Sequence, residues 1–383
     1  MRVFRSLGIR WAEPRPARSE EAKDDLTTAP ERAAGALHPD ALAVAPPREL
    51  WTPLPRPVPG RSVTGTLPDD PFARVVLRLP RDWSGRVVVS GSPGITSERG
   101  LDIYWSDFLL SRGDAFACTD KVVRAVADGA TLYVPQSAEC GIARWYPRLK
   151  ALGVLAREEA RRFYGKAPAR VYAVGVSNGG YLARCAAEDP SPWLDGALEV
   201  SGVFWTSGPE SLLARLPQAL RAMEGATPDR SALEAAGFGA EPPWDTLRDS
   251  YARTFWECSL ALFVWDVDPD YAGPLSRYDP AARPAAVRER IAAASHTGLL
   301  RVPLLSLAGR RDFLIPCRDH AEAYQRLAAS CGAAHLHGLS VVEAGTHVDA
   351  DKASSPQAEP LMPHAHRLFE RLVKRVEEGV TAS

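Results

Sequence analysis

Ser177 lies in the setting that most clearly suggests chemistry. It is the central residue of the Gly-Val-Ser-Asn-Gly stretch 175–179, a G-x-S-x-G pattern. The apolar run Val171–Gly175 precedes this pattern, and a helical pattern begins near Tyr181. A sharp turn from strand to helix exposes a serine in this way, and the flanking glycines allow neighbouring backbone to come close. Ser177 is therefore the candidate nucleophile.

An acid and a base follow later in the chain. Asp312 comes after the buried-strand pattern Val302–Gly309 and four residues before Pro316, and His347 ends the stretch Ser340–His347. A serine hydroxyl is a poor nucleophile until an imidazole takes its proton, and an acid must hold that imidazole in one tautomer. In this chain order the three residues resemble the catalytic triad of the α/β-hydrolase superfamily, and the resemblance implies that His347 is the general base and that Asp312 orients it.

Other acids and histidines lie near these positions but lack the same context. Asp319 and His320 fit the start of a helix, whereas Asp349, two residues past the histidine, is expected to point elsewhere. His296 lies in or beside a long segment without strands. Asp120 ends a strand, where it could line the cleft or satisfy backbone donors in its loop. The second role is favoured, because Asp is common in turns.

An oxyanion hole requires two backbone N–H groups. Asn178, which follows the nucleophile, is expected to supply the first. The second is expected from the loop that ends Val87–Gly94. This loop resembles the H-G-x-P-G loop of α/β-hydrolases with Ser90 in place of the histidine, and the resemblance implies that Ser92 is the donor. The alternative is an ordinary turn, because Ser-Gly-Ser-Pro-Gly is also simple turn chemistry.

Short β-rich runs that alternate with helical patterns must position these residues. This alternation predicts a mostly parallel central sheet flanked by helices. The expected strands are Phe72–Leu79, Arg86–Ser90, Ala115–Thr119, Thr131–Val134, Val171–Gly175, Leu198–Ser201, Pro303–Ala308 and Leu339–Val342. The expected helices are Leu101–Ser111, Arg144–Arg162, Tyr181–Glu188 and His364–Glu378.

Two segments interrupt this rhythm. Residues 204–298 are long, helix-like and rich in tryptophan, which predicts a helical cap inserted before the acid-bearing strand. The alternative is a stabilising excursion that does not touch substrate. The core is then expected over 51–203 and 299–383. Residues 1–50 are rich in proline and show no apolar periodicity, which predicts an extended or poorly ordered arm. The alternative is a strap that packs along the core from Trp51 onward.

Aromatic residues are the expected lining of a substrate pocket, because ligand pockets are mostly apolar and aromatic. Tyr104, Trp105 and Trp205 are the candidates. The same residue types also fill protein cores, and the sequence leaves both readings open.

The sequence resembles the α/β-hydrolase superfamily at three places. These are the sharp strand-to-helix turn at Ser177, called the nucleophile elbow, the G-x-x-D-x-x-x-P stretch from Gly309 and the Gly-Thr-His that ends at His347. The resemblance implies an α/β-hydrolase fold with the chain order Ser, Asp, His. The run Leu110–Asp120 also resembles bacterial tannase- and feruloyl-esterase-like hydrolases. In that narrower family a cysteine typically lies beside the serine and another beside the histidine, and a disulfide joins the two cysteines. This chain lacks both cysteines.

Composition is that of a globular protein. Apolar residues make up 45% of the chain and charged residues 24%, and the formal net charge is −1. This balance does not indicate binding to nucleic acid or to an anionic membrane surface. We find no apolar run of signal-peptide or membrane-span length, and the expected location is the cytoplasm. The six cysteines lack metal-like spacing and are interpreted as small buried hydrophobes.

These patterns predict a carboxylic-ester hydrolase that acts on a small-molecule ester and requires no metal or organic cofactor. An apolar cap surface would favour a homodimer. The same triad can serve an amidase, a thioesterase or an acyltransferase. A binding protein on a hydrolase fold is the alternative from another class, although no member of the triad is missing.

Overall fold

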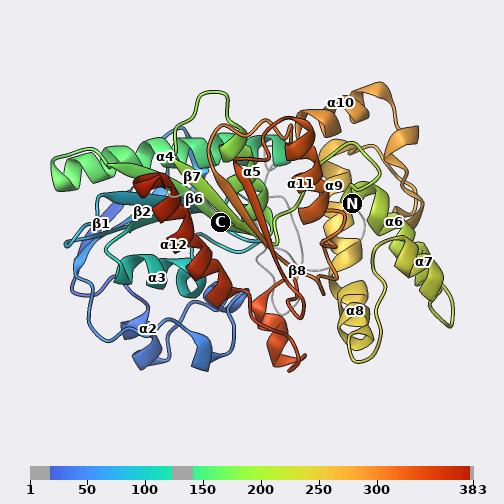
Figure 1. Cartoon of the computed structure of the whole chain (residues 1–383), viewed down its shortest axis with the longest axis horizontal. Helices are drawn as coiled ribbons and strands as arrows, with labels where there is room; N and C mark the ends of the chain where they lie inside the picture. The colour runs from blue at the N-terminus through green and yellow to red at the C-terminus, as the bar shows by residue number, and fades with distance from the viewer. Residues whose placement is uncertain (1–17, 123–140, 380–383) are drawn as a thin grey trace.

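The computed structural model describes residues 18–122 and 141–379. Within these residues, nine strands form one sheet in the order β1-β2-β3-β5-β4-β6-β7-β8-β9 (Figure 1). The strands are β1 (Ser19–Lys23), β2 (Gly60–Leu67), β3 (Asp70–Pro80), β4 (Arg86–Gly91), β5 (Ala115–Thr119), β6 (Arg170–Val176), β7 (Gly196–Val200), β8 (Leu304–Gly309) and β9 (His337–Val342).

The sheet is antiparallel at one edge and parallel elsewhere. The pairs β1–β2, β2–β3 and β3–β5 are antiparallel, whereas β5, β4, β6, β7, β8 and β9 run parallel. This arrangement confirms the predicted mostly parallel sheet. The predicted strand Thr131–Val134 lies outside the described residues.

Apolar side chains cover both faces of the sheet, which is why the central strands read as continuous apolar runs. In β4, Val87 and Val89 face one apolar cluster while Val88 faces the other, as expected when successive side chains alternate. The first cluster packs against α4 (Ile142–Tyr164), α5 (Asn178–Glu188) and α11 (Ala321–Ser330), and the second against α3 (Asp107–Ser111) and α12 (Met362–Glu378). A short π-helical stretch, Asp102–Ser106, leads into α3.

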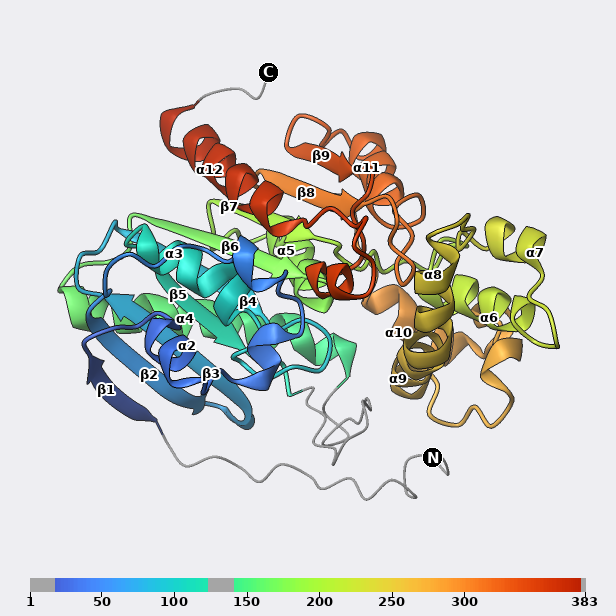
Figure 2. The same cartoon turned by 90° about the horizontal axis from the view of Figure 1, so that it is seen from below.

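The segment between β7 and β8 is helical, and we call residues 204–298 the insertion. It contains α6 (Leu212–Ala222), α7 (Arg230–Ala235), α8 (Asp245–Tyr251), α9 (Glu257–Val267) and α10 (Ala285–Ala293), with shorter helical turns at Ala252–Trp256, Leu275–Arg277 and Pro280–Ala282. Figure 2 shows these helices together at one end of the molecule, the end toward which β8 points. Ligands of open parallel sheets bind beyond this end of the strands.

The N-terminal segment differs from the expected arm. Residues 18–50 contain β1, α2 (Ala29–Ala34) and two short 3-10 helices, Pro39–Leu42 and Arg48–Leu50. Buried Asp107 accepts hydrogen bonds from the backbone N–H and the hydroxyl of Thr28, and Arg32 pairs with the same carboxylate at 2.6 Å. Backbone pairing, buried polar contacts and a few buried apolar side chains such as Val44 hold the segment, and these contacts do not produce an apolar period in the sequence.

None of the helices in the described ranges 18–122 and 141–379 combines the length and the apolar character that crossing a membrane requires.

Candidate active site

Ser177 occupies a strained turn between β6 and α5. Its φ is +57° and its ψ is −116°, a combination that L-residues rarely adopt. The surrounding glycines are required by close backbone contacts. A Cβ on Gly175 would lie 2.0 Å from the carbonyl oxygen of Gly179, and a Cβ on Gly179 would lie 2.3 Å from that of Gly91. The G-x-S-x-G pattern therefore follows directly from the packing of this turn.

The structure brings the three predicted triad residues together. His347 Nε2 lies 3.0 Å from Ser177 Oγ, and His347 Nδ1 lies 2.8 Å from Asp312 Oδ2. All three side chains are buried, with exposed fractions of 7% or less. Both distances are within hydrogen-bonding range, so the imidazole can accept the serine proton on one side while donating to the carboxylate on the other.

The loop after β8 orients Asp312. Its Oδ1 accepts the backbone N–H groups of Leu314 at 2.9 Å and Ile315 at 2.8 Å, so that Oδ2 faces the histidine. Burial disfavours the charged imidazolium, but the charge of Asp312 and its hydrogen bond outweigh this effect and raise the pKa of His347 above 6.5. The carboxylate therefore makes His347 a stronger base.

The expected oxyanion hole is only partly matched. Asn178 is the first residue of α5, where backbone N–H groups lack helical partners. The backbone N–H of Ser92, however, donates to Thr119 O at 2.8 Å. Ser92 is therefore not a free donor, because it continues the hydrogen-bonding of β4 with β5. Gly94, two residues later and at φ +46°, lines the same cavity as Ser177 and Asn178.

The cavity beside Ser177 is small and apolar. It has a volume of about 20 Å³. Leu212, Leu262 and Phe263 come from the insertion, and Leu314 and Ile315 come from the loop that carries Asp312. The remaining lining residues are Gly94, Ser177, Asn178, Val203 and Ser259. No charged side chain lines this cavity within the described ranges.

Comparison with known proteins gives no match to a protein-family model and none to a curated protein sequence. Solved structures do match. Feruloyl esterase B from Aspergillus oryzae is 16% identical over 86% of this chain and 83% of its own, with a TM-score of 0.60. An esterase from Aspergillus oryzae is 11% identical over 97% of this chain and 87% of its own, with a TM-score of 0.59. This chain has the α/β-hydrolase fold.

Within this α/β-hydrolase fold, the aromatic residues expected to contact substrate lie away from the cavity at Ser177. Tyr104 and Trp105 are buried in the cluster between the sheet and α12, where Trp105 contacts Phe369 with ring centroids 6.0 Å apart. Trp205 is buried against Phe263, and its indole N–H donates to Ile291 O at 3.1 Å. None of the three lines the cavity at Ser177. All three are buried core residues in this structure, because their side chains fill the interior.

The other acids and histidines have structural partners. Asp120 accepts the backbone N–H groups of Arg74 and Val122, as expected, each at 3.0 Å. Asp349 points away from the triad and accepts backbone N–H groups from Leu361 and Met362.

His320 and His296 hold the chain where it enters the insertion. His320 immediately precedes α11, and its Nδ1 accepts the backbone N–H of Phe204 at 2.9 Å. His296 Nδ1 accepts the next backbone N–H, that of Trp205, at 3.1 Å. Both rings are buried, and burial lowers the pKa of His296 to about 4. They therefore act as neutral acceptors.

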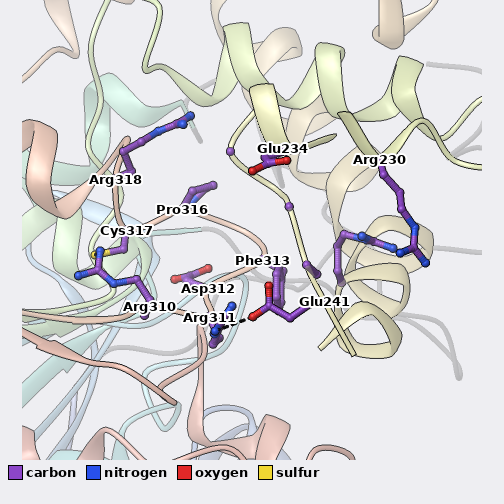
Figure 3. Close-up of a pocket in the computed structure, with 14 residues that line it drawn as sticks. Arg230, Glu234, Glu241, Arg310, Arg311, Asp312, Phe313, Pro316, Cys317 and Arg318 are labelled. Carbon is purple, nitrogen blue, oxygen red and sulfur yellow. Dashed lines mark hydrogen bonds and ion pairs between the residues drawn. The ribbon is translucent and has the colours of Figure 1, made fainter. Parts of the chain in front are cut away.

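A larger pocket of about 400 Å³ lies on the other side of the acid loop (Figure 3). Phe313 and Pro316 face this pocket, whereas Leu314 and Ile315 face the cavity at Ser177. Several of its charged residues pair with neighbours, as Arg311 does with Glu241 at 2.8 Å. Ser177 does not line this pocket. We therefore place the candidate site at the smaller cavity.

Proposed function

We propose that the protein is a serine hydrolase that cleaves a carboxylic ester through an acyl-enzyme intermediate. The observation that carries this proposal is the hydrogen-bonded series from Ser177 Oγ through His347 to Asp312, at 3.0 and 2.8 Å. An activated serine needs this arrangement, and the strained turn under Ser177 is typical of a nucleophile elbow.

The proposed reaction has two halves. In the first, His347 takes the proton of Ser177 while Oγ attacks the ester carbonyl carbon, and Asp312 stabilises the imidazolium. The tetrahedral intermediate collapses as His347 gives its proton to the leaving alcohol. In the second half, His347 takes a proton from water, the resulting hydroxide attacks the acyl-enzyme, and the carboxylic acid leaves as Ser177 recovers its proton.

The backbone N–H groups of Asn178 and Gly94 are the proposed donors to the oxyanion. Gly94 replaces Ser92 in this role because the Ser92 N–H already bonds to Thr119 O. Two donors aimed at the developing negative charge stabilise the transition state more than the uncharged ester carbonyl.

The insertion is proposed to act as a cap that limits the acyl group. Its residues Leu212, Leu262 and Phe263 close the cavity beside Ser177. A volume of about 20 Å³ holds little more than one water-sized group. The apolar lining also disfavours a charged acyl chain, whose desolvation it would not offset. The preferred substrates are therefore uncharged esters of short-chain acids.

Covalent labelling tests this proposal. Wild type and Ser177→Ala are treated with a fluorophosphonate and their intact masses are compared, with Ser330→Ala as the matched control because Ser330 is exposed. We expect one adduct on wild type and on Ser330→Ala, and none on Ser177→Ala. Hydrolysis of p-nitrophenyl acetate should follow the same order. A folded wild type that neither labels nor hydrolyses the ester would contradict the proposal.

A further inference from the structure

Lys121 is an unusual residue next to the proposed oxyanion loop. It lies two residues after the end of β5, has a left-handed φ of +59° and is 0% exposed. Its Nζ donates to the hydroxyl oxygen of Ser92 at 2.9 Å and also to the carbonyl oxygens of Ser92 and Gly94. The ring of Trp145 lies 5.7 Å from the ammonium. The ammonium is thus held by uncharged groups.

Burying this ammonium is unfavourable. Desolvation lowers the pKa of Lys121 to about 8, so the side chain remains mostly protonated at neutral pH. The charge of the adjacent Asp120, whose carboxylate accepts two backbone N–H groups, favours the ammonium but does not offset the effect of burial. A buried charge held by neutral oxygens destabilises the fold. Such groups are concentrated at functional sites.

The contacts of Lys121 fix the loop on both sides of one peptide group. Its ammonium binds the carbonyl oxygens of Ser92 and Gly94. Between them, Pro93 O accepts the N–H of Thr96 at 3.1 Å and its hydroxyl at 2.8 Å. In a trans peptide the carbonyl and the N–H point in opposite directions. The carbonyl opposite the Gly94 N–H is Pro93 O, which Thr96 holds, and Lys121 holds the carbonyls on either side of it. Together these bonds set the direction of the Gly94 N–H.

Lys121 does not form a second nucleophile–base pair with Ser92. The Ser92 hydroxyl donates to Thr96 O at 2.9 Å, and its side chain is 0% exposed. A nucleophile must reach substrate, and this hydroxyl is closed off. The role of the lysine therefore concerns the loop.

We propose that Lys121 is a positioning residue for the oxyanion hole, which holds the Gly94 N–H toward Ser177 and adds a positive charge behind the loop. This inference rests on the proposed function. Both effects favour the negatively charged tetrahedral intermediate over the neutral ester, so they act on kcat more than on KM.

The test compares Lys121→Met with wild type on p-nitrophenyl acetate. Lys374→Met is the control, because Lys374 is exposed on α12. We expect Lys121→Met to lower kcat by about 10- to 100-fold while KM changes by less than about twofold. The inhibition constant of a methyl trifluoromethyl ketone, which forms an anionic adduct with the serine, should rise by a similar factor. Circular dichroism checks the fold of each variant.

A second measurement needs no variant. The rate constant kcat of wild type should fall as the pH rises through about 8, because the protonated form of Lys121 is then lost. Within the described ranges 18–122 and 141–379, Cys118 and Asp120 interact electrostatically with the ammonium of Lys121, and Arg148 donates to its backbone carbonyl. Burial raises the pKa of Cys118 well above its ordinary value and that of Asp120 to about 7. Neither of these two groups titrates just above pH 8.

The outcomes separate the two proposals. This inference alone is overturned if the wild type hydrolyses the ester and a folded Lys121→Met has the same kcat. It is also overturned if the kcat of the wild type is constant from pH 7 to 10. A folded wild type that hydrolyses no ester and takes no label overturns the proposed function, and this inference falls with it.

Discussion

Tyr251 in helix α8 of the insertion donates a hydrogen bond of 2.8 Å to Asp351, four residues after His347. The ring of Tyr251 also stands perpendicular to the imidazole of His347, with centroids 6.4 Å apart. Burial raises the pKa of Asp351 to about 6, so the carboxylate is mostly ionised at neutral pH. The insertion is thus tied to the segment that carries the proposed base.

Replacing Tyr251 by Phe should destabilise the protein. The substitution leaves the carboxylate of Asp351 without this donor, which typically lowers the free energy of unfolding by about 1–3 kcal/mol. Urea unfolding measures the effect. Tyr271→Phe is the matched control, because the Tyr271 hydroxyl donates to Pro274 O in an exposed setting. Equal losses in the two variants would show that the contact with Asp351 adds no stability.

Removing any member of the triad should abolish most turnover. We expect Ser177→Ala, His347→Ala and Asp312→Asn each to lower kcat by about 10⁴-fold or more while leaving the fold intact. Because the residues act as a unit, the double variant of Ser177 and His347 should lose no more than either single variant. His364→Ala, at a histidine that pairs with Glu359 near the surface, is the control. Full activity in Asp312→Asn would place the acid elsewhere.

Ester hydrolysis should depend on pH through His347. The general base must be neutral, so kcat/KM should fall as the pH drops through the pKa of this residue. That pKa is raised above 6.5, because Asp312 outweighs the opposing effect of burial. In Asp312→Asn the charge of Asp312 is lost, and the lowering effect of burial is then opposed only by the charge of Asp351. The residual activity should then persist to lower pH, and a midpoint shifted upward would contradict this assignment.

The apolar cavity predicts a preference for short acyl chains. We expect kcat/KM on p-nitrophenyl esters to fall steadily from acetate to hexanoate. Leu262→Ala should raise kcat/KM for hexanoate by about 10-fold, since it opens room for one to two methylene groups at about 0.8 kcal/mol each. Leu299→Ala is the control, because Leu299 is 46% exposed. A wild type that prefers hexanoate would show that the cavity opens when substrate binds.

A buried ion pair joins α5, the helix that follows Ser177, to the neighbouring strand β7. Arg184 of α5 donates to Glu199 of β7 at 2.6 Å, both side chains are buried, and Glu199 also accepts the N–H of Gly202 at 2.6 Å. Arg184→Met leaves the carboxylate unpaired and should cost about 3–5 kcal/mol of stability. Arg170→Met, which breaks the exposed pair with Asp195, should cost about 1 kcal/mol or less. Thermal unfolding distinguishes the two.

Local patterns explain most of what could be predicted. The turn at Ser177 requires glycines at defined positions and an apolar strand before it, and these requirements are written in consecutive residues. The strands from β3 to β9 in the described residues also appear as apolar runs, because helices cover both faces of the sheet. By contrast, the apolar patterns do not predict β1 and β2. The strand β1 is exposed at the edge, and backbone pairing with distant residues holds it there without an apolar pattern.

The sequence by itself determined the type of sheet, the elbow and the order of serine, acid and histidine, because each depends on residues close together in the chain. Tertiary structure alone decided which aromatic residues are core, whether Ser92 or Gly94 faces the cavity, and that Lys121 contacts the proposed oxyanion loop at Ser92, 29 residues away. These outcomes depend on which face of an element packs inward and on which distant carbonyl reaches a given N–H. No local spacing records those choices.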